Sequence, residues 1–310
     1  MIYTCTITPS IDYTAYLPKF ESGTLNRSEE VYYYPGGKGI NVSRVLSRLG
    51  LKSRALGYAG GFTGRYIEEF LATEGIETDF IDAGDITRIN VKIKSEAETE
   101  LNGPGPELEQ HQLEQLTDKV ATMAEGDWFV LAGSLPASVP IQFFKDLAVS
   151  CHERGIHFVL DTSGPALEAL LDTQPFLIKP NEHELGEMFG VTITTQQQAF
   201  HYASLLVERG IQHVVVSMGG SGAIYVSRDH RYQAKAPQGK AVNTVGSGDS
   251  LVSGFIASYI QHQDPKQAFR YGVASGSATA FRSDLCELAD VERLLPEVSI
   301  TPFEEKDVTQ

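Results

Sequence analysis

Short apolar runs alternate with segments of helical periodicity along most of the chain. Leu251, Phe255 and Tyr259 repeat every four residues, for example, and so mark one face of a helix. Apolar runs without that period, such as Trp-Phe-Val-Leu-Ala at 128–132, are typical of buried strands. On this basis we expect strands at 2–7, 54–59, 128–132, 157–160, 176–178 and 213–218, and helices at 41–49, 64–74, 108–123, 141–153, 196–208, 250–261 and 266–281.

This strand-then-helix order predicts an α/β fold with a mostly parallel sheet that is covered by helices on both faces. Residues 1–310 are expected to form a single domain. Two segments, about 11–34 and 88–101, lack the helical period, and the second alternates polar and apolar residues like a hairpin. We expect both to form a small extra sheet that acts as a lid over a ligand site. Edge strands of the main sheet are the alternative.

Composition narrows the classes of function. The chain is 42% hydrophobic and 21% charged, which is typical of a globular protein, and its formal net charge of −15 argues against binding to nucleic acid or to an anionic membrane. No apolar run approaches the roughly 18 residues of a membrane span, and no secretion signal begins the chain. The three scattered cysteines are typical of reduced, buried thiols. We therefore expect a cytoplasmic protein.

The segment Asn-Thr-Val-Gly-Ser-Gly-Asp-Ser at 243–250 carries the strongest chemical signal. Its glycines let the main chain approach a ligand, and the unpaired N–H groups of the helix that follows attract anions. Asp249 adds a carboxylate that is able to deprotonate a hydroxyl group. An anion cradle beside a base suits phosphoryl transfer. An ordinary helix N-cap after a glycine-rich turn is the alternative.

A second glycine-rich segment, Pro-Gly-Gly-Lys-Gly-Ile-Asn-Val at 35–42, also precedes a predicted helix. Lys38 brings positive charge and Asn41 both a donor and an acceptor, which suits a hydroxylated anionic ligand. The segment is not a phosphate-binding Walker A loop, because glycine follows Lys38 where that loop has serine or threonine.

Two arginines and one aspartate in the lid segments are candidates for ligand contacts. Arg27 and Arg88 would supply the positive charge that a phosphorylated substrate requires in so acidic a protein. Asp12 would accept hydrogen bonds from sugar hydroxyls. Solvated charges and an Asx turn are the respective alternatives.

Two further segments follow predicted strands. In Lys-Pro-Asn-Glu-His-Glu at 179–184, carboxylate and amide oxygens would hold a hydrated Mg²⁺. The alternative is that the acidic side chains only interact favourably with the dipole at the start of a helix. The glycine-rich Ser-Met-Gly-Gly-Ser-Gly at 217–222 is explained equally well by a hairpin and by a nucleotide contact.

In their order along the chain, these four segments resemble those of the PfkB (ribokinase-like) carbohydrate kinases, and the resemblance covers essentially the whole sequence. Three small or polar exchanges depart from the usual pattern, at Thr8, Asn243 and Ser247. The segments 9–13, 25–27, 88–92 and 99–106 resemble the branch of the family that phosphorylates fructose 1-phosphate. Tagatose 6-phosphate is the alternative substrate, and a sugar-phosphate-binding regulator without turnover is the alternative of another class.

The resemblance implies that Asp249 deprotonates the C6 hydroxyl of fructose 1-phosphate as that oxygen attacks ATP. An aspartate of ordinary pKa, about 3.9, is a weak base, which suffices for a loose transition state. The resemblance also implies binding roles for other residues. The transferring phosphoryl group would be bound by Gly246, Ser247 and Gly248, and the substrate by Asp12, Arg27, Gly37, Lys38, Asn41 and Arg88. The nucleotide would be bound by Lys179, Ser217, Gly219 and Gly222, and Mg²⁺ by Asn181 and Glu184. Exposed tyrosines at 32–34 suggest a homodimer that pairs through the lids.

Overall fold

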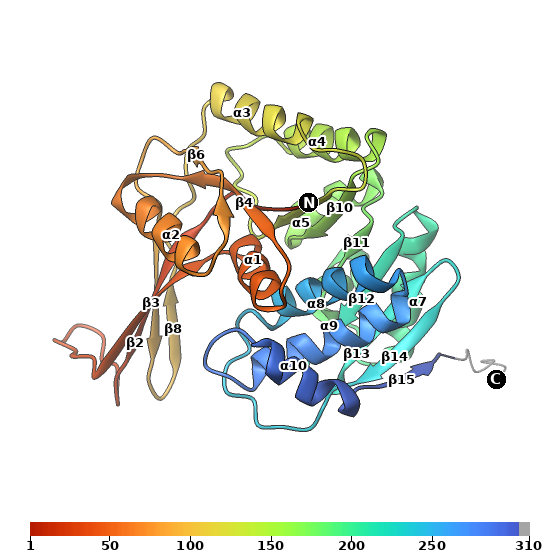
Figure 1. The fold of residues 1–310 in the computed structure, drawn as a ribbon. Helices are drawn as coiled ribbons and strands as arrows, with labels where there is room; N and C mark the ends of the chain where they lie inside the picture. The colour runs from red at the N-terminus through yellow and green to blue at the C-terminus, as the bar shows by residue number, and fades with distance from the viewer. Residues whose placement is uncertain (304–310) are drawn as a thin grey trace.

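The computed structural model describes residues 1–303, which form two sheets and the helices that cover them (Figure 1). The main sheet has 11 strands in the order β15-β14-β13-β12-β11-β10-β9-β1-β4-β5, with β6 paired to β4. Its strands are β1 (Ile2–Thr6), β4 (Ser53–Ala59), β5 (Glu77–Thr78), β6 (Ile81–Asp82), β9 (Trp128–Ala132), β10 (His157–Asp161), β11 (Leu177–Ile178), β12 (His213–Ser217), β13 (Ala223–Ser227), β14 (Arg231–Lys235) and β15 (Ser299–Pro302).

The sheet is parallel from β5 to β12, as the alternation of strands and helices predicts. Beyond β12 it continues antiparallel through β13, β14 and β15, which the sequence pattern did not predict. β12, β13 and β14 are joined by short connections without an α-helix, whereas three helices within residues 247–294 separate β14 from β15. Short helices α5, α6 and α10 were also missed.

Helices cover both faces of the main sheet. Residues of β9 alternate between the two cores, with Phe129 and Leu131 on one side and Trp128 and Val130 on the other. The first core is closed by α3 (Gln110–Ala121), α4 (Ile141–Glu153), α5 (Gly164–Leu170), α6 (Glu182–Phe189) and α7 (Gln196–Glu208). The second is closed by α1 (Lys38–Arg48), α8 (Ser247–His262), α9 (Pro265–Ala280) and α10 (Leu288–Leu294). Helix α2 (Gly61–Thr73) packs on a third, smaller core beside β4.

The small sheet has four strands in the order β3-β2-β7-β8 and projects from one side of the molecule (Figure 1). Its strands are β2 (Ser10–Tyr16), β3 (Glu30–Gly36), β7 (Ile89–Lys94) and β8 (Glu98–Leu101). The two segments expected to form an extra sheet therefore do so, and they are not edge strands of the main sheet. Asp12 pairs with Tyr34 on one side and with Asn90 on the other, so these three side chains share one face.

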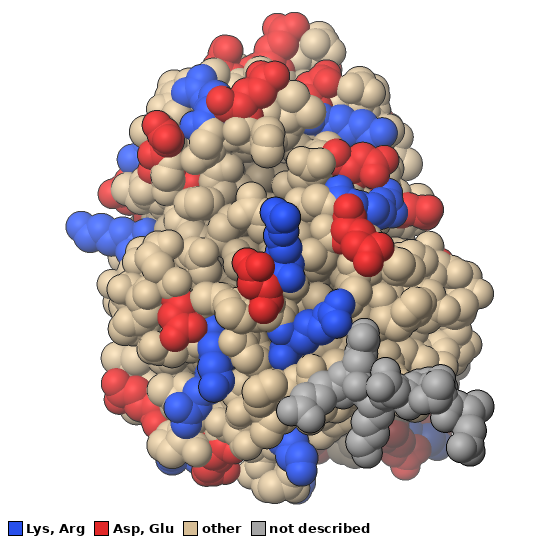
Figure 2. All heavy atoms as spheres, turned by 90° about the vertical axis from the view of Figure 1, so that its right-hand side faces the viewer, with Lys and Arg blue, Asp and Glu red and all other residues tan. Residues whose placement is uncertain are grey.

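Two observations bear on binding to polyanions and membranes. Figure 2 shows that acidic and basic side chains lie interspersed on the face that is on the right of Figure 1. Mixed charge there agrees with the net charge of −15 in giving no support to nucleic-acid binding. Among residues 1–303, no helix has the length and apolar character needed to cross a bilayer.

Candidate active site

A cleft of about 330 Å³ opens at the carboxyl ends of the parallel strands β1, β9, β10 and β11, between the main and small sheets. Open α/β sheets bind ligands at this edge. Most of the residues predicted to bind or transfer a phosphoryl group line it. The lining residues are Thr6, Thr8, Ser10, Asp12, Gly37, Lys38, Asn41, Arg88, Asn90, Gly133, Ser134, Ser163, Lys179, Val245, Gly246, Gly248 and Asp249.

Asp249 lies in the first turn of α8, 5% exposed, and accepts a hydrogen bond at Oδ2 from Nδ2 of Asn41 at 2.8 Å. Burial raises the pKa of Asp249 to about 6, and the nearby negative charge of Asp161 adds to the effect. Lys38 and Asn41 act in the opposite direction. An aspartate with a pKa close to neutrality is a better match for a general base than the ordinary one that the sequence predicts.

The turn before Asp249 depends on glycine. Gly246 caps α8 in the left-handed region, with φ 79°, which other residues rarely adopt. A Cβ on Gly248 would lie 3.0 Å from Nζ of Lys179, so the lysine amine packs directly against this segment. Ser247 is not among the residues that line the cleft, and its buried Oγ has no hydrogen-bond partner within residues 1–303. The glycine-rich turn, in which the N–H of Ser247 donates to the carbonyl oxygen of Thr244 at 3.2 Å, and the buried amine of Lys179 thus lie beside the first turn of α8.

Asp161, the last residue of β10, is the main site residue that the sequence reasoning missed. It is 1% exposed, and its Oδ1 lies 3.0 Å from Nζ of Lys38 and 3.6 Å from Nζ of Lys179. Burial alone would raise the pKa of Asp161, but the two lysines outweigh it and hold that pKa below its usual value. Its second oxygen, Oδ2, is buried with no hydrogen-bond partner. An aspartate that ends a buried parallel strand is the signal that would have found it.

Lys38 is charged in this environment. Burial alone would lower the pKa of Lys38, but the charges of Asp161, Asp249 and Glu184 raise it above its ordinary value. Lys38 is therefore a permanent cation next to the candidate base, where developing negative charge on a phosphoryl group would be neutralised.

At the small-sheet end of the cleft, Asp12 is held by three side chains. Its Oδ1 accepts hydrogen bonds from Ser10 Oγ at 2.8 Å and from Asn90 Nδ2 at 3.2 Å, and its Oδ2 lies 2.9 Å from Nζ of Lys92. The prediction had Asp12 alone, without Asn90 or Lys92. The neighbours come from the parallel strand β7, whose register with β2 was not visible in the sequence.

Arg88 is half-buried at the start of β7 and lines the cleft. It donates to the carbonyl oxygens of Gly103 and Thr8, each at 3.0 Å, while its buried Nε has no partner. Burial lowers the pKa of Arg88. Within residues 1–303, no carboxylate lies within ion-pair distance of this guanidinium, so its charge is available to an anionic ligand.

Arg27, the other predicted arginine, is exposed in the connection between β2 and β3 and does not line the cleft. The structure of the single chain therefore does not bring it together with the other predicted residues. Its position in a loop of the small sheet, 11 residues beyond the end of β2, accounts for the difference.

Asn181 and Glu184 close the N-terminus of α6 as a capping box. Asn181 Oδ1 accepts from the backbone N–H groups of His183 and Glu184 at 2.9 and 2.8 Å, and Glu184 Oε2 accepts from the Asn181 N–H at 2.8 Å. This is the helix-start alternative that the sequence left open. The other carboxylate oxygen of Glu184 takes no part in the cap. Among the described residues, no group of three or more His, Cys, Asp or Glu side chains is arranged to hold a metal ion by itself.

Ser217, Gly219 and Gly222 end β12 and form the turn into β13, and none of them lines the cleft. Gly222 has φ 94°, and a Cβ there would lie 2.0 Å from the carbonyl oxygen of Ala234, so the hairpin alone requires glycine at this position. Ser217 lies beside Asn181, with which it forms an isolated parallel bridge.

Comparison with known proteins gives a consistent result. The sequence pattern described as pfkB family carbohydrate kinase matches residues 4–290. The chain is 48% identical to 1-phosphofructokinase from Bacillus subtilis, over 97% of this chain and 99% of that protein. It is 35% identical to D-tagatose-1-phosphate kinase from Bacillus licheniformis over the same shares. The fold is similar to that of phosphofructokinase-2 from Escherichia coli in complex with substrates and products, with a TM-score of 0.91, 31% identity, and coverage of 96% of this chain and 98% of that one.

Proposed function

Since the chain belongs to the pfkB family of carbohydrate kinases, we propose that it transfers the γ-phosphoryl group of ATP to the C6 hydroxyl of fructose 1-phosphate. The product is fructose 1,6-bisphosphate. The observation that carries the proposal is the buried Asp249, whose pKa is raised to about 6, in the first turn of α8 directly after the glycine-rich turn. High identity to a 1-phosphofructokinase supports fructose 1-phosphate over tagatose phosphates as the substrate.

In the proposed reaction, Asp249 takes the proton of the C6 hydroxyl. The C6 oxygen then forms a bond to the γ-phosphorus as the bond from that phosphorus to the β,γ-bridging oxygen breaks, and ADP leaves. Asn41 orients the carboxylate through its 2.8 Å hydrogen bond. The N–H groups of Gly246, Ser247 and Gly248 stabilise the charge that develops on the transferring group.

The remaining residues of the cleft have binding roles in this proposal. Arg88, which has no carboxylate partner within the part of the chain that the structure describes, holds the substrate phosphate, and Lys38 adds positive charge near the base. Asp12, with its neighbours Asn90 and Lys92, and Asn41 read the sugar hydroxyls. The backbone at Gly37, which is in the lining, allows the sugar to approach.

ATP is the phosphoryl donor of this family, and we propose that its nucleotide contacts Lys179, Ser217, Gly219 and Gly222. Mg²⁺ is proposed to accompany ATP. The donor set fits such an ion, because Glu184 keeps one carboxylate oxygen outside its cap and Asp161 has a buried, unpartnered oxygen. Glu184 and Asn181 would hold it through water, and its chemistry is to neutralise phosphate charge.

Two further parts of the proposal concern assembly and location. The small sheet exposes Tyr32, Tyr33 and Leu101, 42%, 51% and 63% accessible, and we propose that two copies pair through these sheets. Such pairing is one way for the exposed Arg27 to reach a bound phosphate. Sedimentation of the full chain tests it.

A cytoplasmic location is proposed because the three buried cysteines are free and the phosphoryl donor is ATP.

An assay of ADP release tests the catalytic proposal against the alternative of a regulator without turnover. Purified protein with ATP, Mg²⁺ and fructose 1-phosphate is expected to release one ADP for each fructose 1,6-bisphosphate formed. Saturable binding of fructose 1-phosphate without ADP release would identify a sugar-phosphate sensor.

A further inference from the structure

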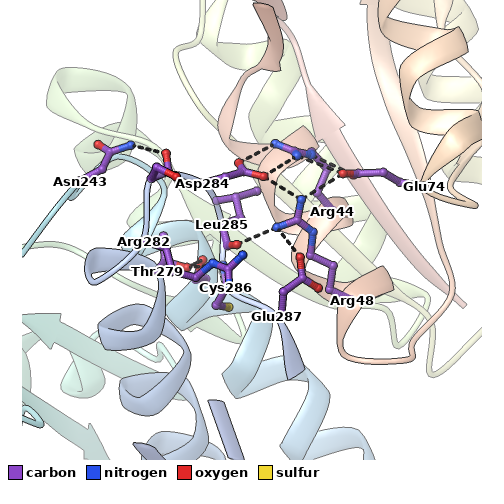
Figure 3. Close-up of polar contacts among 12 residues, drawn as sticks. Arg44, Arg48, Glu74, Asn243, Thr279, Arg282, Asp284, Leu285, Cys286 and Glu287 are labelled. Carbon is purple, nitrogen blue, oxygen red and sulfur yellow. Dashed lines mark hydrogen bonds and ion pairs between the residues drawn. The ribbon is translucent and has the colours of Figure 1, made fainter. Parts of the chain in front are cut away.

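A cluster of charged side chains, with Arg44 buried and Arg48, Glu74 and Asp284 half-buried, joins α1 to the loop that precedes α10 (Figure 3). Arg44, 2% exposed, donates from Nε and Nη2 to both oxygens of Glu74 at 2.8 and 3.0 Å. From Nη1 and Nη2 it donates to both oxygens of Asp284 at 3.3 and 3.0 Å. The same guanidinium lies over Phe70 at 5.2 Å and over Tyr34 of the small sheet at 5.7 Å. One side chain thus connects α1, α2, the small sheet and the loop.

Arg48, one helical turn further along α1, completes the cluster. Its Nη2 donates to Glu74 at 3.0 Å and to Asp284 at 2.8 Å, and its Nη1 donates to the carbonyl oxygen of Leu285 at 2.6 Å. Burial alone would raise the pKa values of Glu74 and Asp284, but the two arginines outweigh it and lower both. Each arginine thus pairs with both carboxylates, so removal of one carboxylate would leave the buried charge of Arg44 less well compensated.

The loop held by this cluster packs against the anion cradle. A Cβ on Gly246 would lie 2.5 Å from Cδ2 of Leu285, so this leucine packs against the residue that caps α8. The carbonyl oxygen of Ser283 accepts a hydrogen bond from Nδ2 of Asn243 at 3.3 Å, and Asn243 Oδ1 in turn accepts from the N–H of Val245 at 3.1 Å. The loop therefore contacts the cradle segment at Asn243 and at Gly246.

A second connection reaches the first turn of α8. The N–H of Cys286 donates to Oγ1 of Thr279 at 2.9 Å, and that hydroxyl lies 2.7 Å from Oγ of Ser250. Ser250 and Thr279 are both buried. Ser250 directly follows Asp249, and Thr279 lies at the end of α9. A displacement of the loop would thus move the start of α8 as well as the turn before it.

We propose that Arg44 is a positioning residue for phosphoryl transfer: it acts through Asp284 and Leu285 to hold the N–H groups of the cradle in register with Asp249. The inference rests on the proposed function for its kinetic consequence. Arg44 positions the N–H groups of the cradle, and Asn41, on the preceding turn of α1, positions the carboxylate through its hydrogen bond to Asp249. Donors that act on developing charge must be accurately placed, so their displacement lowers kcat more than it changes substrate affinity.

Asp284→Asn and Arg44→Lys test the proposal. Both keep the approximate size of the side chain and remove the paired double hydrogen bonds. We expect kcat to fall about tenfold or more, while KM for ATP and for the phosphosugar stay within about threefold. Asp284 is 27% exposed and its variant decides the question if Arg44→Lys does not fold. Arg54→Lys is the matched control, because Arg54 pairs with Glu77 and lies over a tyrosine ring far from the cradle.

Amide hydrogen exchange of residues 242–255, measured without any substrate, provides the second readout. Exchange in this segment should be faster in Asp284→Asn than in the native protein and unchanged in Arg54→Lys. A variant that is only less stable, such as Ile67→Val in the core beside α2, should leave both kcat and this local exchange unchanged. Either a kcat within twofold of native in folded Asp284→Asn, or unchanged exchange there, overturns the proposal. Absence of turnover in the native protein would instead refute the proposed function and leave the exchange test intact.

Discussion

Asn41 and Asp249 are 208 positions apart in the sequence, yet Nδ2 of the first donates to Oδ2 of the second at 2.8 Å. The bond joins the two glycine-rich segments, each of which opens a helix at the edge of the main sheet. It also fixes one oxygen of Asp249, so the other is left to face the cleft. The carboxylate that we propose as the base is therefore oriented by the segment that we propose as the sugar site.

Replacement of Asp249 distinguishes a role as the general base from a role as a helix cap. Asp249→Asn keeps the shape and is able to accept the hydrogen bond from Asn41, but it cannot take a proton. We expect kcat to fall roughly 10²–10⁴-fold, the usual contribution of a positioned general base. Steady-state kinetics on the purified variant provide the measurement, and turnover close to that of the native protein would remove Asp249 from the mechanism.

The same variant makes a prediction about stability. The pKa of Asp249 is about 6 in the folded protein against an ordinary value of 3.8, so the folded state binds the proton more tightly than the unfolded one. Stability is therefore lost as pH rises through this window, and Asp249→Asn should escape that loss. Thermal unfolding should show the variant at least as stable as the native protein at pH 7, with the difference shrinking toward pH 4. A variant that is less stable at pH 7 would contradict this.

The pH dependence of catalysis follows from the same pKa. The base is active only when deprotonated, so kcat/KM should fall about tenfold per pH unit below about pH 6 and level off above it. A profile with its acid limb near pH 4 would indicate that the carboxylate titrates in the free enzyme like an ordinary aspartate.

The general architecture could be predicted from the sequence because local patterns determine it. Alternating apolar runs and helical periods identified the separate small sheet and the parallel strands β1, β4, β9, β10, β11 and β12, but not the two-residue strands β5 and β6. The strands β13 and β14 were missed because their short turns carry no helical signal, and β15 was missed because it is short and mostly exposed and so forms no apolar run. The partners Asp161, Asn90 and Lys92 were missed for a different reason: strand order and register bring them beside site residues that are far from them in the chain. The raised pKa of Asp249 depends on burial and on Asp161, and so was equally invisible.

Arg88→Ala tests the phosphate-binding end of the cleft. The side chain makes hydrogen bonds only to carbonyl and hydroxyl oxygens of Gly103 and Thr8 and faces the cleft without a carboxylate partner. A charge-assisted contact to one ligand is worth roughly 1.5–3 kcal/mol, so KM for the phosphosugar should rise about tenfold or more while KM for ATP changes little. Arg65→Ala, at an exposed position of α2, is the control. Equal weakening for both substrates would count against the assignment.

Glu184→Gln distinguishes the metal role of Glu184 from its capping role. Glutamine is able to accept the hydrogen bond from the Asn181 N–H, so the capping box and the unfolding temperature should be preserved. Loss of the carboxylate charge should raise the Mg²⁺ concentration needed for half-maximal activity several-fold. Titration of activity with Mg²⁺ at saturating ATP measures this, and an unchanged titration with unchanged stability would leave Glu184 with the capping role alone.

The central claim is that this chain is a kinase for fructose 1-phosphate. Steady-state kinetics with fructose 1-phosphate, tagatose 6-phosphate and fructose 6-phosphate, measured side by side, test it most directly. A site that pairs particular hydroxyls discriminates strongly, because a mismatched sugar leaves buried polar groups such as Asp12 and Asn41 unpaired. We predict that kcat/KM for fructose 1-phosphate exceeds the others by at least about tenfold, which corresponds to about 1.4 kcal/mol of transition-state discrimination. A preference for tagatose 6-phosphate would contradict the substrate assignment while leaving the base and the anion cradle in place.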